Sequence, residues 1–306
     1  MRDECIYIAG HNGMVGSALL RACQSKNVAT LTASRSELDL CNQSDTFNFL
    51  QENKPSAVII AAAKVGGIYA NSTQPAEFCY ENLTIATNLI AGSYAAGVKR
   101  LLFIGSSCIY PRECPQPIVE EYLLQSPLEK TNEAYALAKI AGLKMCQYYR
   151  EQYGVTYHSV MPCNLYGPRD NYHPENSHVI PALIRRFHFA KINGDKAVTI
   201  WGSGTPLREF LHADDLARAC MVCLDLQNPP DVLNIGHGEE LTIRELAEVI
   251  RSVVGYEGEI ILDGSKPDGT PRKVLDSSKI HNLGWHPEIE LYNGLVDAYK
   301  DFQQRL

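Results

Sequence analysis

The stretch CIYIAGHNGMVGSALLRACQS, residues 5–25, decides the predicted fold. CIYIAG predicts a short buried strand, and MVGSALLRACQS predicts a helix. Between them, Gly10, Gly13 and Gly16 have G-x-x-G-x-x-G spacing, so a tight turn joins the strand directly to the helix. Glycine lets the backbone approach a pyrophosphate, whose charge the amino end of the helix stabilises. The spacing differs from G-x-G-x-x-G, and a tight turn without a ligand is the alternative, but the strand–turn–helix context favours a nucleotide.

The alternation of apolar strands and helices continues through the first half of the chain. Further strands are predicted at 28–34, 57–63, 100–107 and 157–162, and long helices at about 75–96 and 132–154. Continuous apolar strands between helices indicate a parallel sheet covered on both faces. We therefore predict an α/β fold with a Rossmann-type, doubly wound parallel sheet. We assign residues 1–165 to a nucleotide-binding Rossmann domain and 166–306 to a smaller α/β lobe that interleaves with it.

The bulk composition is that of an ordinary globular chain. Its 306 residues are 45% hydrophobic and 21% charged, and the formal net charge is −7. An acidic chain of this kind predicts no nucleic-acid partner, although a local cationic pocket for a small phosphorylated ligand is compatible with it. The sequence has no secretory signal pattern and no apolar run long enough to cross a bilayer. We therefore expect a cytoplasmic protein with no membrane association.

Ten cysteines are scattered through the chain, mostly in apolar segments. This distribution predicts buried thiols in a reducing compartment rather than a disulfide framework. Cys220 and Cys223 have C-x-x-C spacing, but no second pair or nearby histidine completes a zinc site. We expect two packed thiols on one helix face, and no metal.

The end of the second predicted strand indicates which dinucleotide is bound. An acidic residue there would hold a ribose hydroxyl, whereas an arginine accommodates a 2′-phosphate. The segment TASRSELDL supplies Arg35, which favours NADPH over NADH, and Asp39 lies farther into the turn. A solvated surface arginine is the alternative reading of Arg35.

Tyr135 and Lys139 share one face of the helix predicted at 132–154, because they are four residues apart. A lysine ammonium beside a phenol favours the phenolate and lowers its pKa. Such a tyrosine can exchange a proton with an alcohol or ketone during hydride transfer. The spacing alone is common on amphipathic helices, but Ser106, after the fourth strand, supplies a further hydroxyl.

Taken together, the glycine turn, the serine and the Y-x-x-x-K pair resemble the extended short-chain dehydrogenase/reductase family. The matching stretches span nearly the whole chain: GHNGMVGSAL, AAAKVGGI, LLFIGSSCIYP, NEAYALAKIAG, NLYGPRDNYHPENSHVIPALIRRFH, WGSGTPLREFLHADDLA and KPDGTPRK. Within the family, the resemblance is to enzymes that act on GDP-linked keto sugars. It implies that GDP-4-keto-6-deoxy-D-mannose is epimerised at carbons 3 and 5 and its ketone is then reduced with NADP(H).

The resemblance also implies catalytic roles. Cys108 would be the base that removes protons next to the ketone, and His178 the acid on the opposite face of the sugar. Ser106 and Tyr135 would polarise the ketone oxygen, with Lys139 tuning Tyr135. A packed thiol and a helix-capping histidine are the alternatives for Cys108 and His178.

Further binding residues follow from the same resemblance. The cofactor would contact Gly10, Asn12, Gly13, Met14, Val15, Gly16, Arg35, Asp39, Leu40, Ala62, Ala63, Lys139, Asn164, Leu165, Gly167 and His178. The GDP-sugar would contact Ser107, Cys108, Asn164, Arg186, Trp201, Arg208, Asp268 and Lys273. Ordinary core packing is the alternative for Trp201. Related enzymes often carry an arginine at position 12 that helps to bind the 2′-phosphate, and this chain has Asn12.

Several alternatives remain open on sequence alone. One is a related epimerase/reductase on another GDP-4-keto sugar, such as one on the route to GDP-L-colitose. A UDP-sugar 4-epimerase that holds NAD and a non-catalytic dinucleotide sensor are less consistent with Arg35, Cys108 and His178, and with the intact Ser–Tyr–Lys set. The family resemblance implies a homodimer formed through the two long helices.

Overall fold

The computed structural model describes residues 4–174, 176–266 and 268–306. A parallel sheet of six strands runs in the order β10-β5-β4-β3-β1-β2. Its strands are β1 (Cys5–Ala9), β2 (Ala29–Leu31), β3 (Ala57–Ile60), β4 (Arg100–Ile104), β5 (Thr156–Pro162) and β10 (Val232–Ile235). The Rossmann-type, doubly wound sheet predicted from the sequence is confirmed.

The strands are continuous apolar segments because helices cover both faces of the sheet. Every residue of β3 is fully buried, for example. On one face α2 (Gln43–Asn53), α4 (Pro75–Ala95) and α5 (Glu133–Tyr153) pack side by side, and on the other α1 (Met14–Ser25) packs against α7 (Ala213–Leu224). The two long helices lie within about one residue of their predicted ends, whereas β2 and β3 are shorter than predicted.

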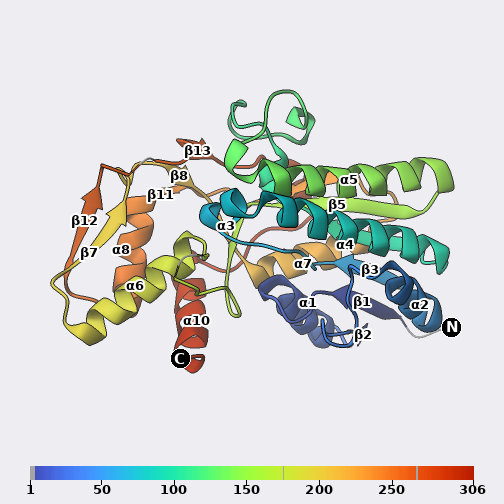
Figure 1. Cartoon of the computed structure of the whole chain (residues 1–306), viewed down its shortest axis with the longest axis horizontal. Coiled ribbons are helices and arrows are strands. Elements are labelled where there is room, and N and C mark those ends of the chain that lie inside the picture. The colour runs from blue at the N-terminus through green and yellow to red at the C-terminus, as the bar shows by residue number, and fades with distance from the viewer. Residues whose placement is uncertain (1–3, 175, 267) are drawn as a thin grey trace.

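A second lobe with its own apolar core lies beside the sheet (Figure 1). Its helices are α6 (Val179–Asn193), α8 (Ile243–Val254) and α10 (Leu291–Gln304). Its strands form three small sheets: β7 (Ala197–Trp201) with β12 (Glu259–Asp263), β6 (Asn164–Tyr166) with β9 (Phe210–His212), and β8 (Leu207–Arg208) with β11 (Leu241–Thr242) and β13 (Arg272–Lys273). Short helices α3 (Ile68–Thr73) and α9 (Ser278–Asn282), with 3-10 turns at Ser107–Ile109, Glu120–Tyr122 and Lys130–Asn132, complete the described chain.

The chain passes between the lobes more than once. After β6, α6 and β7–β9, it returns to the large sheet, where α7 packs on α1 and β10 pairs with β5. It then leaves again for α8 and α10. Cys220 and Cys223 are free, fully buried thiols of α7, as expected. Within the described ranges, no helix combines the length and apolar character needed to span a membrane.

Candidate active site

The glycine turn after β1 lies where the direction of strand order reverses, between β1 and β3. Gly10 has a φ of +87°, and a Cβ on it would lie 2.6 Å from the main-chain nitrogen of Ala62. A Cβ on Gly16 would lie 2.1 Å from the carbonyl oxygen of Gly10. Both positions therefore require glycine. Gly13 is the N-cap of α1 and, as a glycine, has no side chain to cap the helix. The N–H groups of the first turn, including those of Met14 and Val15, are therefore left to bind an anion.

The residues predicted to hold the adenosine end lie after β2 and β3. Arg35 is highly exposed, and its guanidinium lies 3.8 Å from Glu81 of α4. The Asp39 carboxylate accepts from the N–H of Cys41 at 3.0 Å, and the Leu40 carbonyl accepts from Asn88 at 2.9 Å. The Asp39 carboxylate is thus already hydrogen-bonded within its own turn, while the exposed Arg35 guanidinium can bind a phosphate. A dinucleotide with a 2′-phosphate fits this donor set and the glycine cradle.

Tyr135 and Lys139 lie on one face of α5, as predicted, but the pKa of Tyr135 does not shift in the predicted direction. The buried Lys139 ammonium donates to the carbonyl of Ile104 at 2.8 Å and lies 5.7 Å from the centre of the Tyr135 ring. Burial lowers the pKa of Lys139 to about 8. Burial, reinforced by neighbouring Cys108, raises the pKa of Tyr135 above its usual value. The expectation of a lowered pKa for Tyr135 is therefore wrong, because burial of the phenol is the largest influence on it.

The stretch around Cys108 forms a 3-10 turn directly after β4. Ser106 is its N-cap, and the Ser106 hydroxyl oxygen accepts from the Cys108 N–H at 3.2 Å, which leaves the hydroxyl proton free to donate. Ser107 is buried beneath them. The Cys108 sulfur, partly exposed, accepts from the side-chain amide of Asn132 at 3.3 Å and lies 4.0 Å from the ammonium of Lys273. Cys108 therefore has two polar donors, which a thiol that only fills the core would not need.

Sequence reasoning missed Asn132. It occupies the N-cap of α5, where asparagine usually accepts from the helix backbone, yet its side chain makes no capping bond. The position next to the Y-x-x-x-K motif was a signal, but only the fold shows that the amide turns to a residue 24 positions away. Lys273, predicted to contact the substrate, is brought to the same sulfur.

His178 occupies the N-cap of α6, but its ring does not cap the helix. Its segment is held beside the loop after β3, because the carbonyl of Asn176 accepts from the N–H of Gly67 at 3.0 Å. The side chain is exposed, and the protein packed around it lowers the pKa of the imidazole. The imidazole of His178 is therefore accessible to a ligand, as a proton donor to a substrate must be.

The predicted GDP-binding residues gather on the second lobe. Trp201 is 63% exposed, so it is not a core residue. The guanidinium of Arg186 lies 5.5 Å from the centre of its ring, and the ammonium of Lys266, which the sequence did not single out, lies 5.6 Å from it. The Asp268 carboxylate accepts from both the N–H and the hydroxyl of Ser203, at 2.9 and 2.7 Å.

Four other predicted residues lie in or next to β6 and β8. Arg208 of β8 donates to the carbonyl of Leu207 at 2.7 Å, and burial lowers its guanidinium pKa. Asn164 of β6 donates to the carbonyl of Glu209 at 3.0 Å. Gly167, with a φ of +150°, lies against the ring of His212. Leu165, between them in the chain, packs against the core of the first lobe.

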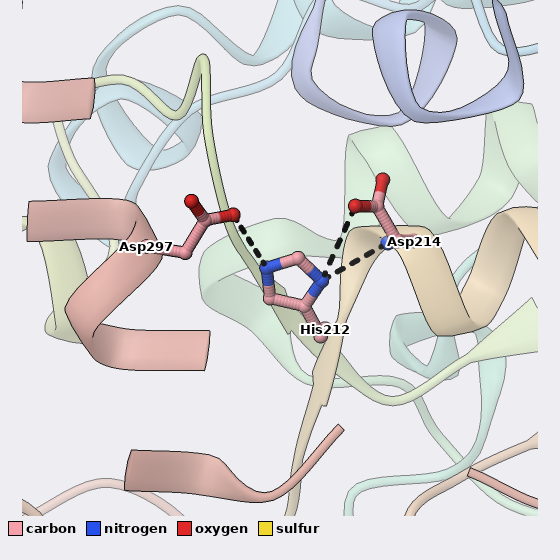
Figure 2. A group of neighbouring side chains, drawn as sticks. All are labelled: His212, Asp214 and Asp297. Carbon is pink, nitrogen blue, oxygen red and sulfur yellow. Dashed lines mark hydrogen bonds and ion pairs between the residues drawn. The ribbon is translucent and has the colours of Figure 1, made fainter. Parts of the chain in front are cut away.

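His212, Asp214 and Asp297 form a cluster of potential metal ligands (Figure 2). The Nδ1 atom of His212 accepts from the N–H of Asp214 at 3.2 Å and thereby caps α7. The Asp297 carboxylate lies 3.9 Å from the other ring nitrogen of His212, Nε2. Because the carboxylates face different nitrogens and Nδ1 is already an acceptor, this arrangement links α7 to α10 and does not suit a single ion.

The sequence model of the NAD dependent epimerase/dehydratase family matches residues 6–236. The chain belongs to this family. The match covers the large sheet, the glycine turn and the Ser–Tyr–Lys group, which are the parts that members of an NAD dependent epimerase/dehydratase family would need for a dinucleotide reaction.

Curated relatives match over nearly the full length. GDP-L-fucose synthase 1 of Arabidopsis thaliana is 57% identical over 96% of this chain and 91% of its own. GDP-L-fucose synthase of Escherichia coli is 50% identical over 99% and 97%. GDP-L-colitose synthase of Yersinia pseudotuberculosis is 39% identical over 97% of each chain.

Two similar solved structures are described as bound to NADP. The GDP-mannoheptose C4 reductase of Campylobacter jejuni with NADP bound has a TM-score of 0.90 and 38% identity, covering 99% of both chains. The GDP-L-fucose synthetase of Naegleria fowleri bound to NADP has a TM-score of 0.91 and 25% identity, covering 100% of this chain and 95% of that one.

Proposed function

We propose that the protein is a GDP-L-fucose synthase, an NADPH-dependent enzyme that epimerises GDP-4-keto-6-deoxy-D-mannose at carbons 3 and 5 and reduces the 4-ketone to give GDP-L-fucose. The observation that carries this proposal is the thiol of Cys108. It lies in the same turn as Ser106, beside Tyr135, and accepts from Asn132. A reductase needs only the Ser–Tyr–Lys group, whereas an epimerase also needs a base for carbon-bound protons.

The epimerisation uses the acidity that the ketone gives to its neighbouring carbons. The Cys108 thiolate removes a proton from carbon 3 or 5, and the electron pair of that C–H bond moves to the ketone oxygen as an enolate. Hydrogen bonds from the hydroxyls of Ser106 and Tyr135 stabilise this negative oxygen. His178 returns a proton to the opposite face of the carbon. Its lowered pKa makes the protonated imidazole a stronger acid.

The reduction uses the same oxygen-binding pair. NADPH, when bound, supplies the hydride to carbon 4. Tyr135 is protonated at neutral pH because burial raises its pKa, so it is in the form that gives a proton to the developing alkoxide. The Lys139 ammonium, 5.7 Å from the ring centre, then stabilises the phenolate that remains.

The remaining predicted residues bind either the cofactor or the GDP moiety of the substrate. The glycine turn, the amino end of α1 and the exposed Arg35 suit the phosphates of NADP(H). On the second lobe, Trp201 offers an exposed ring to a guanine, and Arg186, Arg208 and Lys266 suit a diphosphate. We therefore assign the cofactor mainly to residues 1–165 and the GDP moiety of the substrate to 166–306, with the sugar held at Cys108 and Tyr135.

A homodimer and a cytoplasmic location complete the proposal. Tyr80 of α4 and Leu137 and Tyr148 of α5 are large side chains that remain at least 49% exposed on the two packed long helices. A second copy of the same helices would bury them. All ten cysteines are free thiols, which suits a reducing compartment. Light scattering at micromolar concentration tests the dimer, since a monomer there would contradict it.

A related activity on another GDP-4-keto sugar is the second candidate, because GDP-L-colitose synthase also matches at 39% identity. The higher identity to GDP-L-fucose synthases, 57% and 50%, favours the first candidate. The second candidate would be favoured if the protein turned over a 3-deoxy GDP-4-keto sugar but not GDP-4-keto-6-deoxymannose.

The decisive experiment is an assay in heavy water with GDP-4-keto-6-deoxymannose, comparing the wild-type protein with Cys108→Ser. NADPH oxidation and deuterium at carbons 3 and 5 are followed together. We expect the wild type to oxidise NADPH and label both carbons, and the variant to lose the label. Reduction without label in the wild type would identify a plain reductase and make Cys108 a packed thiol.

A further inference from the structure

Arg169 lies in the loop after β6, in the second lobe, and its backbone conformation is unusual. Its φ is +67°, in the left-handed region that side chains other than glycine and asparagine rarely adopt. The Arg169 N–H donates to a carboxylate oxygen of Asp301, on α10, at 2.7 Å. The same carboxylate is bound by Arg305 at 3.0 Å. A left-handed arginine whose backbone is fixed in this way is a candidate for a functional role.

The side chain of Arg169 crosses from its own lobe to the glycine turn of the other. Its Nη1 atom donates to the carbonyl of Asn12 at 3.4 Å, a contact between residues 157 positions apart. The residue is exposed, and across the parts of the chain that the structure describes its guanidinium forms no ion pair. Most of its N–H donors are therefore open to a ligand above the turn.

The turn itself lacks a cation for the phosphates it would approach. Residues 10–16 contain no lysine or arginine, and position 12 is an asparagine. Arg21, farther along α1, is already paired with Asp214. Without another cation, only the amino end of α1 would stabilise the charge of a dinucleotide phosphate at this turn. Arg35 lies farther away, at the adenosine end of the cofactor.

We propose that Arg169 is a cofactor-binding residue, and that its guanidinium binds a phosphate group of NADP(H) above the glycine turn. The proposal rests on the NADP-binding function proposed above. It makes the second lobe contribute a cation to the cofactor site of the first. The Asp301 carboxylate fixes the backbone of Arg169, and the bond to the Asn12 carbonyl places its guanidinium beside the glycine turn.

The test measures equilibrium binding of NADP⁺ and NAD⁺ to the whole protein by isothermal titration calorimetry. Arg169→Asn removes the guanidinium with a residue that adopts the left-handed conformation readily. Arg305→Ala is the matched control, because it removes the other arginine bound to Asp301 and leaves Arg169 in place. Arg169→Lys tests whether a point charge restores part of the affinity.

We expect Arg169→Asn to weaken NADP⁺ binding about tenfold, the scale of one exposed charge-assisted contact, with Arg169→Lys intermediate and Arg305→Ala close to wild type. Loss for NADP⁺ alone identifies the 2′-phosphate, and equal loss for NADP⁺ and NAD⁺ identifies the pyrophosphate. Unchanged affinity in Arg169→Asn, or an equal loss in Arg305→Ala, would overturn the proposal. Failure of the wild type to bind NADP⁺ at all would instead contradict the proposed function.

Discussion

The side-chain amide of Asn132 donates to the sulfur of Cys108 at 3.3 Å, although Asn132 stands at the N-cap of α5 and could have bonded to the helix instead. A capping bond at this position usually stabilises a helix by about 1 kcal/mol. The amide is directed to the sulfur, and its Oδ1 atom is buried without a partner among the described residues. This contact connects the Tyr–Lys helix to the thiol.

Replacing Asn132 with Ala should slow proton exchange by Cys108. The sulfur would lose a donor that stabilises its thiolate, so we expect deuterium incorporation at carbons 3 and 5 to fall roughly tenfold. Alkylation of Cys108 by iodoacetamide at a fixed pH, followed by mass spectrometry, should be slower than in the wild type. Cys114, also half-buried, is the internal control. An unchanged alkylation rate would show that the amide does not act on the sulfur.

Replacing Lys273 with Met distinguishes two roles for its ammonium, which lies 4.0 Å from the Cys108 sulfur. If it supports the thiolate, alkylation of Cys108 in the free protein should slow several-fold, and more at low than at high ionic strength, since salt screens a partly exposed pair. If it serves only the substrate, KM for the GDP-sugar should rise while alkylation stays as in the wild type. We expect the first result.

Replacing Tyr135 with Phe should separate the two halves of the reaction. The variant loses the proton donor for the alkoxide, so NADPH oxidation should fall by about 10²–10⁴-fold. Deuterium labelling should fall much less, because Cys108 and Ser106 remain. Measuring both in one sample checks this, and equal loss of labelling and oxidation would assign Tyr135 to proton abstraction as well.

The carboxyl of Asp170 predicts how stability depends on pH. Burial, with Asp301 nearby, raises the pKa of Asp170 from 3.8 to about 7. Between these values the folded protein retains a proton that the unfolded chain has lost, so stability should fall as the pH rises from about 4 to above 7. Asp170→Asn should have a flatter profile of Tm against pH over this window. A profile parallel to that of the wild type would contradict the assignment.

Features that depend on neighbouring residues in the chain could be predicted from the sequence. The glycine turn, the apolar run of β3 and the spacing of Tyr135 and Lys139 are local patterns with direct physical meaning. Contacts between distant segments could not. Neither the bond from Asn132 to Cys108 nor the reach of Arg169 to Asn12 has a local signal, because each depends on how whole elements pack.

The electrostatic prediction for Tyr135 was wrong for a related reason. Spacing on a helix places a lysine near a phenol, but it does not give the desolvation of either group. Desolvation depends on the elements packed above the helix, and here it sets the pKa of both residues. The exposure of Trp201 likewise follows from its place in the small β7–β12 sheet rather than from its residue type.

The late return of the chain to the large sheet has a consequence for synthesis on the ribosome. β10, residues 232–235, closes the edge of the sheet beside β5, and α7 completes its cover. A nascent chain that has emerged only to residue 165 would expose β5 as a bare edge strand, open to pairing with other chains. Completion of the large sheet therefore requires the segment that carries α7 and β10, residues 213–235, to be translated as well.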